Sequence, residues 1–128
     1  MLRRRIALGL TLALLLAATA STTLAGSTWF NVILPRFGGT ANTNVTTKST
    51  SSQYWEYRDV AVGGGKTVSF TAMRNGTQQV GNWYDSAGGT FHAPYTSSQP
   101  VGALINGKIR NEFTAPVRVQ VWGTFDSR

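Results

Sequence analysis

The sequence predicts an all-β protein, an antiparallel β-sandwich of immunoglobulin-like size with about seven or eight short strands. Short stretches that alternate apolar and polar residues recur along the chain, with turn-forming residues between them. No stretch after the N-terminal segment repeats its apolar residues every 3.6 positions, as an amphipathic helix would. A small β-barrel is the alternative, because closing a sheet on itself suits the same pattern.

The first 25 residues have the layout of a secretory signal peptide. Arg3–Arg5 form a positive start, Ile6–Ala18 is an uncharged apolar run, and small residues precede two possible cleavage points, after Ala20 and after Ala25. The apolar run is shorter than the roughly 20 residues that span a bilayer. We therefore expect a secreted, extracellular protein whose residues 26–128 form one β-sandwich domain, without a stable membrane span after cleavage.

The first predicted strand after this segment is Ser27–Pro35, ended by a proline. Its alternate residues form two partly apolar faces, with Trp29, Asn31 and Ile33 on one and Phe30, Val32 and Leu34 on the other. The next stretch, Ala41–Ser52, is rich in Thr, Asn and Ser. We expect it to form a polar edge strand or an ordered loop.

A stronger strand, Gln53–Val62, should have two different faces. Trp55, Tyr57, Asp59 and Ala61 share one face, and Tyr54, Glu56, Arg58, Val60 and Val62 share the other. The glycines Gly63–Gly65 then predict a hairpin loop. The centre of the chain is Lys66–Tyr84, in which two strands meet at Asn75-Gly76. Asn-Gly is the pair that best tolerates positive φ at both central positions of a type I′ turn, so we expect a hairpin there.

The C-terminal part continues with short strands and turns. The expected elements are a loop at Asp85–Gly89, strands at Thr90–Thr96 and Val101–Ile105, a second type I′ turn at Asn106-Gly107, and strands at Lys108–Thr114 and Val117–Phe125. In the last strand, Val117, Val119 and Val121 should point inward, and Arg118, Gln120 and Trp122 outward.

Composition narrows the function classes. From Gly26 onward the chain has nine Lys and Arg against five Asp and Glu, a net charge of +4. The charges are scattered, without a basic cluster interleaved with aromatic residues, so a nucleic-acid partner is disfavoured. The chain has no cysteine, and its core must therefore hold the domain without a crosslink.

No catalytic, metal or cofactor site is predicted. His92 is the single histidine, and the sequence gives it no evident partner for acid–base catalysis. One imidazole and no thiol do not make a zinc site. The carboxylates of the domain lie far apart in sequence, and no nucleophile motif is present. We expect a protein that is not an enzyme.

The aromatic residues are the better indication of a binding site. Trp122 falls on the polar face of the last predicted strand beside Arg118, and Trp83-Tyr84 precedes a glycine-rich loop. Exposed Trp and Tyr rings on small β-sandwiches can stack on sugars or lie at a membrane interface. The candidate ligand-binding residues are therefore Trp83, Tyr84, Trp122 and Arg118. The alternative is that the tryptophans form the core or a cross-strand ladder.

Three segments resemble small secreted proteins of Gram-positive bacteria that are found beside lactococcin-972-type bacteriocins. The segments are Val32–Pro35, Gly81–Tyr84 and Val119–Asp126. One difference is that Trp122 here precedes Gly123, whereas those proteins carry the aromatic residue after the glycine. The resemblance implies a secreted β-sandwich, and it brings no activity or catalytic residue with it.

These observations support several functional hypotheses. The first is a secreted, non-enzymatic β-sandwich that binds or acts at a bacterial cell envelope, in the setting of bacteriocin production, with a cell-envelope glycan or an anionic surface as partner. The second is a self-assembling surface protein that accepts a strand along Ala41–Ser52. The third is a carbohydrate-binding module, or an inhibitor of secreted hydrolases that presents the loop Asp85–Gly89.

Overall fold

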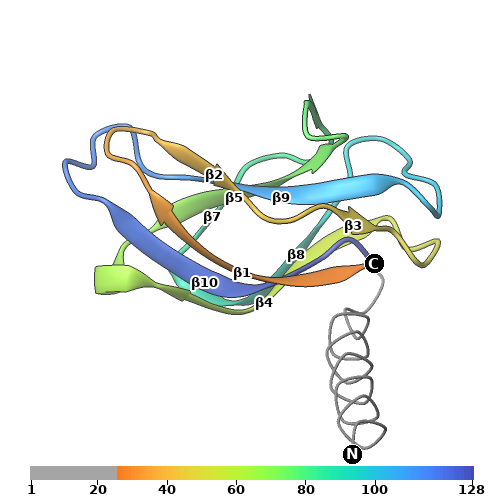
Figure 1. Cartoon of the computed structure of the whole chain (residues 1–128), viewed down its shortest axis with the longest axis horizontal. Helices are drawn as coiled ribbons and strands as arrows, with labels where there is room; N and C mark the ends of the chain where they lie inside the picture. Colours follow the sequence, from red (N-terminus) through yellow and green to blue (C-terminus); the bar gives the residue numbers. More distant parts are fainter. Residues whose placement is uncertain (1–25) are drawn as a thin grey trace, which may run out of the picture.

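The computed structural model describes residues 26–128, and these form two antiparallel sheets packed face to face (Figure 1). The sheets do not close into a barrel, so the predicted β-sandwich is confirmed. The expected signal peptide lies outside the described residues. The strands are β1 (Ser27–Leu34), β2 (Thr40–Asn42), β3 (Thr46–Thr47), β4 (Tyr54–Val62), β5 (Val68–Arg74), β6 (Gln78–Gln79), β7 (Tyr84–Ser86), β8 (Gly88–Pro94), β9 (Leu104–Arg110) and β10 (Val119–Asp126).

One sheet has four strands in the order β1-β10-β4-β8, and the other has six strands built around β9 and β5. In the six-stranded sheet, β2 and β3 share one side of β9, and β6 and β7 share one side of β5. These four are two or three residues long. The stretch Ala41–Ser52 and the returning arm of the central hairpin, each expected as one element, are thus divided into two short strands each.

The core between the sheets is organised around Tyr57, which is fully buried. Its ring contacts five other aromatic rings at centroid distances of 4.9 to 5.9 Å, those of Phe30, Trp55, Phe70, Phe91 and Phe125. Its hydroxyl donates a 2.7 Å hydrogen bond to the Thr71 carbonyl of the facing sheet. Residues 26–128 supply both sheets and the core cluster between them.

The central hairpin is confirmed. Asn75 and Gly76 have φ values of 52° and 72°, the positive pair that a type I′ turn requires. Beyond the turn, β5 pairs first with β6 and then with β7. Val68, Phe70 and Ala72 face the core, as the alternation predicts.

The second expected turn, at Asn106-Gly107, is wrong. Both residues lie inside β9, which continues as one strand from Leu104 to Arg110. Gly107 pairs with Ala72 of β5, directly beneath the Tyr57 hydroxyl. The glycine is there because the large Tyr57 side chain reaches across the core and leaves no room for a Cβ.

A β-bulge overturns the predicted alternation in β4. Between Arg58 and Ala61 the strand has one residue more than either neighbouring strand, and Asp59 takes a left-handed conformation with φ 50°. Val60 therefore turns into the core with Tyr57, and Asp59 stays exposed. A bulge of this kind shifts every later residue to the opposite face.

Two expected loops are also different. Gly63–Gly65 form a short 3-10 turn that leads from β4 in one sheet to β5 in the other, so they do not close a hairpin. The stretch Asp85–Gly89 belongs almost wholly to β7 and β8, with only Ala87 between the strands. The chain changes sheets at that residue.

Three strands expected near the C-terminus also differ. No strand forms at Val101–Ile105 before Leu104, the segment expected at Lys108–Thr114 ends at Arg110, and the last strand begins at Val119. Val117 is exposed, although it was predicted to face inward, and Phe113 is exposed as well. Both lie in the loop between β9 and β10, which has left the sheet and has no facing layer to cover it.

The polar stretch Ala41–Ser52 forms β2, β3 and a turn at the edge of the six-stranded sheet. Within it, Lys48 is fully buried, and its ammonium group donates hydrogen bonds to the carbonyls of Thr50, Ser52 and Arg128. Burial lowers the pKa of Lys48, and the nearby Asp126 opposes this shift. The side chain fastens this edge to the end of the chain.

Candidate functional site

The outer face of the four-stranded sheet carries two exposed tryptophans. Trp29 of β1 and Trp122 of β10 are 63% and 37% exposed. In the strand register Asn31 lies opposite Trp122, and Trp29 lies opposite Thr124. The two tryptophans are therefore diagonal neighbours on one face, with Cα atoms about 7–8 Å apart in such an arrangement.

We call this surface the tryptophan face and define it by Trp29, Asn31, Ile33, Gln120 and Trp122. Ile33 lies opposite Gln120, so it is the other diagonal neighbour of Trp122 and is also exposed. Three apolar side chains thus alternate with two amides across adjacent strands. An exposed surface of this composition is typical of a binding site.

Small residues leave Trp122 accessible on its other side. Trp122 pairs with Ala61 of β4, and Ala61 pairs with Gly88 of β8. Neither residue has a side chain long enough to cover an indole ring. The outer surface of the sheet beside Trp122 therefore carries no large side chain, and a flat ligand can lie there against the indole ring.

The two amides of the face can both contact a polar ligand. The Gln120 amide donates a 2.9 Å hydrogen bond to the Asn31 side-chain oxygen. This bond uses one donor and one acceptor, and an Asn–Gln pair has more of each. The remaining groups of the pair make no other hydrogen bond among residues 26–128.

An ion-pair cluster borders the same face near the C-terminus. Glu56 and Asp126 lie opposite each other on β4 and β10. Arg58 lies 3.7 Å from Glu56 and 3.3 Å from Asp126, and Arg128 lies 3.2 Å from Glu56. Both carboxylates thus have basic partners, and the cluster adds charged hydrogen-bonding groups at the border of the tryptophan face.

Of the four residues predicted to bind a ligand, Trp122 and Arg118 lie on this surface. Arg118 precedes β10, and with Ile33 and Pro35 it lines a pocket of about 250 Å³ at the end of the face. Gln120 lies between Trp122 and Arg118 along the chain, with the same outward direction. The structure therefore groups these two predicted residues on one face.

Trp83 lies elsewhere, beside the six-stranded sheet. Its ring packs against the Arg110 guanidinium at 4.1 Å, and the Phe113 ring packs against the same group at 4.6 Å. Tyr84 is at the rim of the core, where it stacks on Phe91 at 4.8 Å. The two neighbours in sequence thus serve different surfaces, and neither contributes to the tryptophan face.

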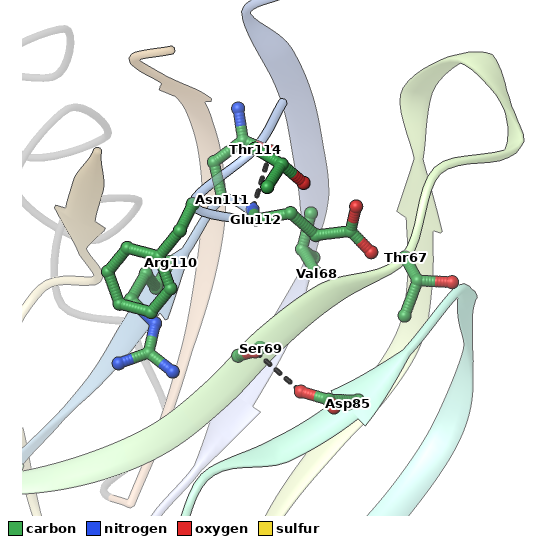
Figure 2. A pocket seen from close by; sticks show the side chains of 9 residues that line it. Thr67, Val68, Ser69, Asp85, Arg110, Asn111, Glu112 and Thr114 are labelled. Carbon is green, nitrogen blue, oxygen red and sulfur yellow. Dashed lines mark hydrogen bonds between the residues drawn. The ribbon is translucent and has the colours of Figure 1, made fainter. Parts of the chain in front are cut away.

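Arg110 borders a second pocket, of about 450 Å³, on the six-stranded sheet (Figure 2). In this view, the Glu112 carboxylate extends from the β9–β10 loop toward Thr67. The Ser69 hydroxyl donates a 2.5 Å hydrogen bond to Asp85. The pocket is polar and mixed in charge, and the planar faces of its one cation pack against Trp83 and Phe113.

Sequence reasoning missed Trp29 and Ile33 as site residues. Alternation in the first strand placed both on one face together with Asn31, and the structure confirms that grouping. It did not show that β1 would pair with β10 and so bring Trp29 beside Trp122. That pairing joins residues from opposite ends of the domain.

The histidine and the buried tyrosines among the described residues pack against, or hydrogen-bond to, other groups of the domain. His92 makes an edge-to-face contact with Tyr54 at 5.7 Å. Burial raises the pKa of Tyr57 and of Tyr95, and each hydroxyl donates a hydrogen bond to a backbone carbonyl. Within residues 26–128 we find no cluster of three or more His, Cys, Asp or Glu side chains that could hold a metal ion.

Comparison with known proteins does not assign a family. No family model, no curated protein and no solved structure matches this chain. None of the helical segments in the described part of the chain is long and apolar enough to cross a membrane. The function therefore has to be argued from the surface of the domain.

Proposed function

We propose that residues 26–128 form a secreted, non-enzymatic module that binds a glycan of the bacterial cell envelope through the tryptophan face. The observation that carries the proposal is the exposure of Trp29 and Trp122 on adjacent strands of one sheet. Covering such rings with a ligand removes apolar area from water, and indole rings contribute more than most side chains at binding surfaces.

A sugar fits this surface because it has two kinds of face. The C–H groups of a pyranose can lie flat on an indole ring, while its hydroxyls hydrogen-bond sideways to amides. Asn31, opposite Trp122, and Gln120, two residues before Trp122 on the same strand, supply these amides. A ligand site needs a few well-placed polar groups within an apolar surface, and this face has that composition.

A strand-accepting edge receives less support. The stretch Ala41–Ser52 forms only β2 and β3, which already pair with β9. Short, interrupted edge strands are a device that prevents the addition of further strands. The association with bacteriocin production remains part of the proposal for the setting in which the module works.

The test is co-sedimentation of the domain with insoluble peptidoglycan and with insoluble reference polysaccharides, and the matched variant is W29T/W122T. Threonine keeps the β-propensity of both positions while it removes the rings. We expect the double variant to lose at least tenfold in affinity, which corresponds to about 1.4 kcal/mol.

The control is Leu104→Thr, an exposed apolar residue of the other sheet. It should bind the glycan as the unchanged domain does. Equal binding by W29T/W122T and the unchanged domain would contradict the proposal, and so would the absence of binding to every glycan tested.

A further inference from the structure

One end of the sandwich carries exposed apolar and basic side chains on two neighbouring loops. The β1–β2 turn and the β9–β10 loop meet there, on the left in Figure 1, and the C-terminus lies toward the other end. We call this end the aromatic-basic tip and define it by Arg36, Phe37, Phe113, Val117 and Arg118. Phe37 and Phe113 are 64% and 67% exposed, and Val117 is also exposed.

The two loops are joined firmly, so these side chains are held outward. The Phe37 amide donates to the Ala115 carbonyl, and the Gly38 amide donates to the Glu112 carbonyl, both at 2.9 Å. The buried Asn111 amide donates to the carbonyls of Pro35 and Val117, at 3.0 and 2.9 Å. These hydrogen bonds hold the two loops in one conformation, so the apolar side chains are exposed in the folded state itself and not only when a loop opens.

The backbone of Phe37 is also unusual. Its φ is 54°, a left-handed conformation that a bulky residue rarely takes, and two glycines follow it directly. Residues held in such conformations cluster at functional sites. Gly38 lies under the Phe113 ring, where a Cβ would collide at 2.5 Å, so the residue that follows Phe37 packs directly against Phe113.

The charge of the tip is positive. Arg36 and Arg118 are both exposed, and neither takes part in an ion pair among residues 26–128. Glu112 is the only acidic residue in the two loops, from Pro35 to Gly39 and from Asn111 to Arg118. The tip therefore complements a negatively charged surface.

We infer that the aromatic-basic tip docks on an anionic lipid bilayer, with the phenylalanines in the interface and the arginines among the headgroups. Charge complementarity decides the occupant. Exposed aromatic rings beside unpaired basic side chains are the composition that binds anionic membrane surfaces. A glycan or a peptide is usually held by several convergent hydrogen-bonding groups, whereas the exposed side chains of this tip are aromatic, aliphatic and cationic. The tip shares Arg118 with the end of the tryptophan face, but the inference does not depend on the function proposed for that face.

The test is co-sedimentation of residues 26–128 with vesicles of phosphatidylcholine, with and without phosphatidylglycerol. This range is used because it supplies both sheets and the core between them, and because it leaves out the apolar run Ile6–Ala18. We expect binding to the anionic vesicles, weaker binding to the neutral ones, and weakening by added salt. F37S/F113S should lose at least tenfold in affinity, because burial of each ring adds to binding.

The charge variant R36Q/R118Q should bind anionic vesicles roughly 25-fold more weakly and lose most of its preference for them, since each basic residue contributes about fivefold. The matched control is R74Q/L104S, which removes one basic and one apolar residue near the other end of the sandwich. It should bind vesicles normally. F37S/F113S should keep its glycan binding, and W29T/W122T should keep its vesicle binding.

Three results would overturn the inference. The first is no binding of the folded domain to anionic vesicles, and the second is an equal loss in the tip variants and in R74Q/L104S. The third is self-association of the domain that F37S/F113S abolishes while vesicle binding stays unchanged. Circular dichroism of each variant shows whether it is folded before its binding is compared.

Discussion

The substitution of Gly107 by alanine tests how the two sheets fit together. Gly107 lies inside β9 under the Tyr57 hydroxyl, and a Cβ at this position would collide with that oxygen. It would also lie 3.0 Å from the Thr43 methyl group. The Tyr57 hydroxyl cannot withdraw freely, because it donates to the Thr71 carbonyl and its ring is packed on all sides.

The expected cost can be worked out from these contacts. Overpacking of a core by one methyl group costs about 1–3 kcal/mol, and loss of the Tyr57 hydrogen bond adds about 1 kcal/mol. Replacing glycine by alanine lowers the entropy of the unfolded chain and returns about 0.4–1 kcal/mol. We therefore expect Gly107→Ala to reduce the free energy of unfolding by about 1–3 kcal/mol.

A double-mutant cycle with Tyr57→Phe identifies the atom responsible. Removing the hydroxyl removes the closest contact and leaves those at 3.0 Å to the Thr43 methyl group and 3.1 Å to the ring carbon Cζ, so Gly107→Ala should cost about 1 kcal/mol less in the Tyr57→Phe variant than in the unchanged domain. Urea unfolding followed by circular dichroism measures all four stabilities. If the two costs simply add, Gly107 does not lie beneath Tyr57, and the register of β9 against the core is wrong.

Three further predictions concern the left-handed backbone of Asp59, the buried ammonium group of Lys48 and the buried hydroxyl group of Tyr95. Asp59→Gly should raise the free energy of unfolding by roughly 0.5 kcal/mol, because glycine adopts φ 50° without the penalty of a side chain, and a lower urea midpoint would refute this. Lys48→Met should destabilise the domain by about 2–4 kcal/mol at neutral pH, because three carbonyls lose their donor; unchanged thermal unfolding would contradict the observed hydrogen bonds. The folded state raises the pKa of Tyr95, so its contribution to stability is complete below the unfolded pKa of about 10 and is lost as the pH rises above it. In urea titrations above pH 10, Tyr95→Phe should therefore lose stability less steeply than the unchanged domain, by up to about 1.4 kcal/mol per pH unit, and equal slopes would count against the raised pKa.

Local sequence patterns predicted the structure correctly where the conformation depends on a single strand or a single turn. Alternation in Ser27–Leu34 separates Trp29 and Ile33 from Phe30 and Leu34, and the structure confirms that separation. The turn at Asn75-Gly76 follows from the backbone preference of two residues. In both places the conformational preference depends on residues that are neighbours in sequence.

The same reasoning failed where a distant residue decides. Asn106-Gly107 has the same local preference as Asn75-Gly76, yet Tyr57, fifty residues earlier in the chain, needs the space above Gly107 and keeps it within a strand. The bulge at Asp59 likewise depends on the pairing of β4 with two other strands. Tertiary packing overrides a local preference because it involves more contacts than a turn of two residues.

By itself, the sequence determined that residues 26–128 would form two sheets with an apolar interior, because periods of two residues and short turns have few other solutions. It also determined that Trp122 and Arg118 would face away from that interior. Only the tertiary structure decided which residues stand beside them. Trp29 joins Trp122 because the first and last strands pair, and the loops that carry Phe37 and Phe113 lie together because they hydrogen-bond at one end of the domain. Both candidate surfaces are assembled by contacts between distant parts of the chain, which no local pattern encodes.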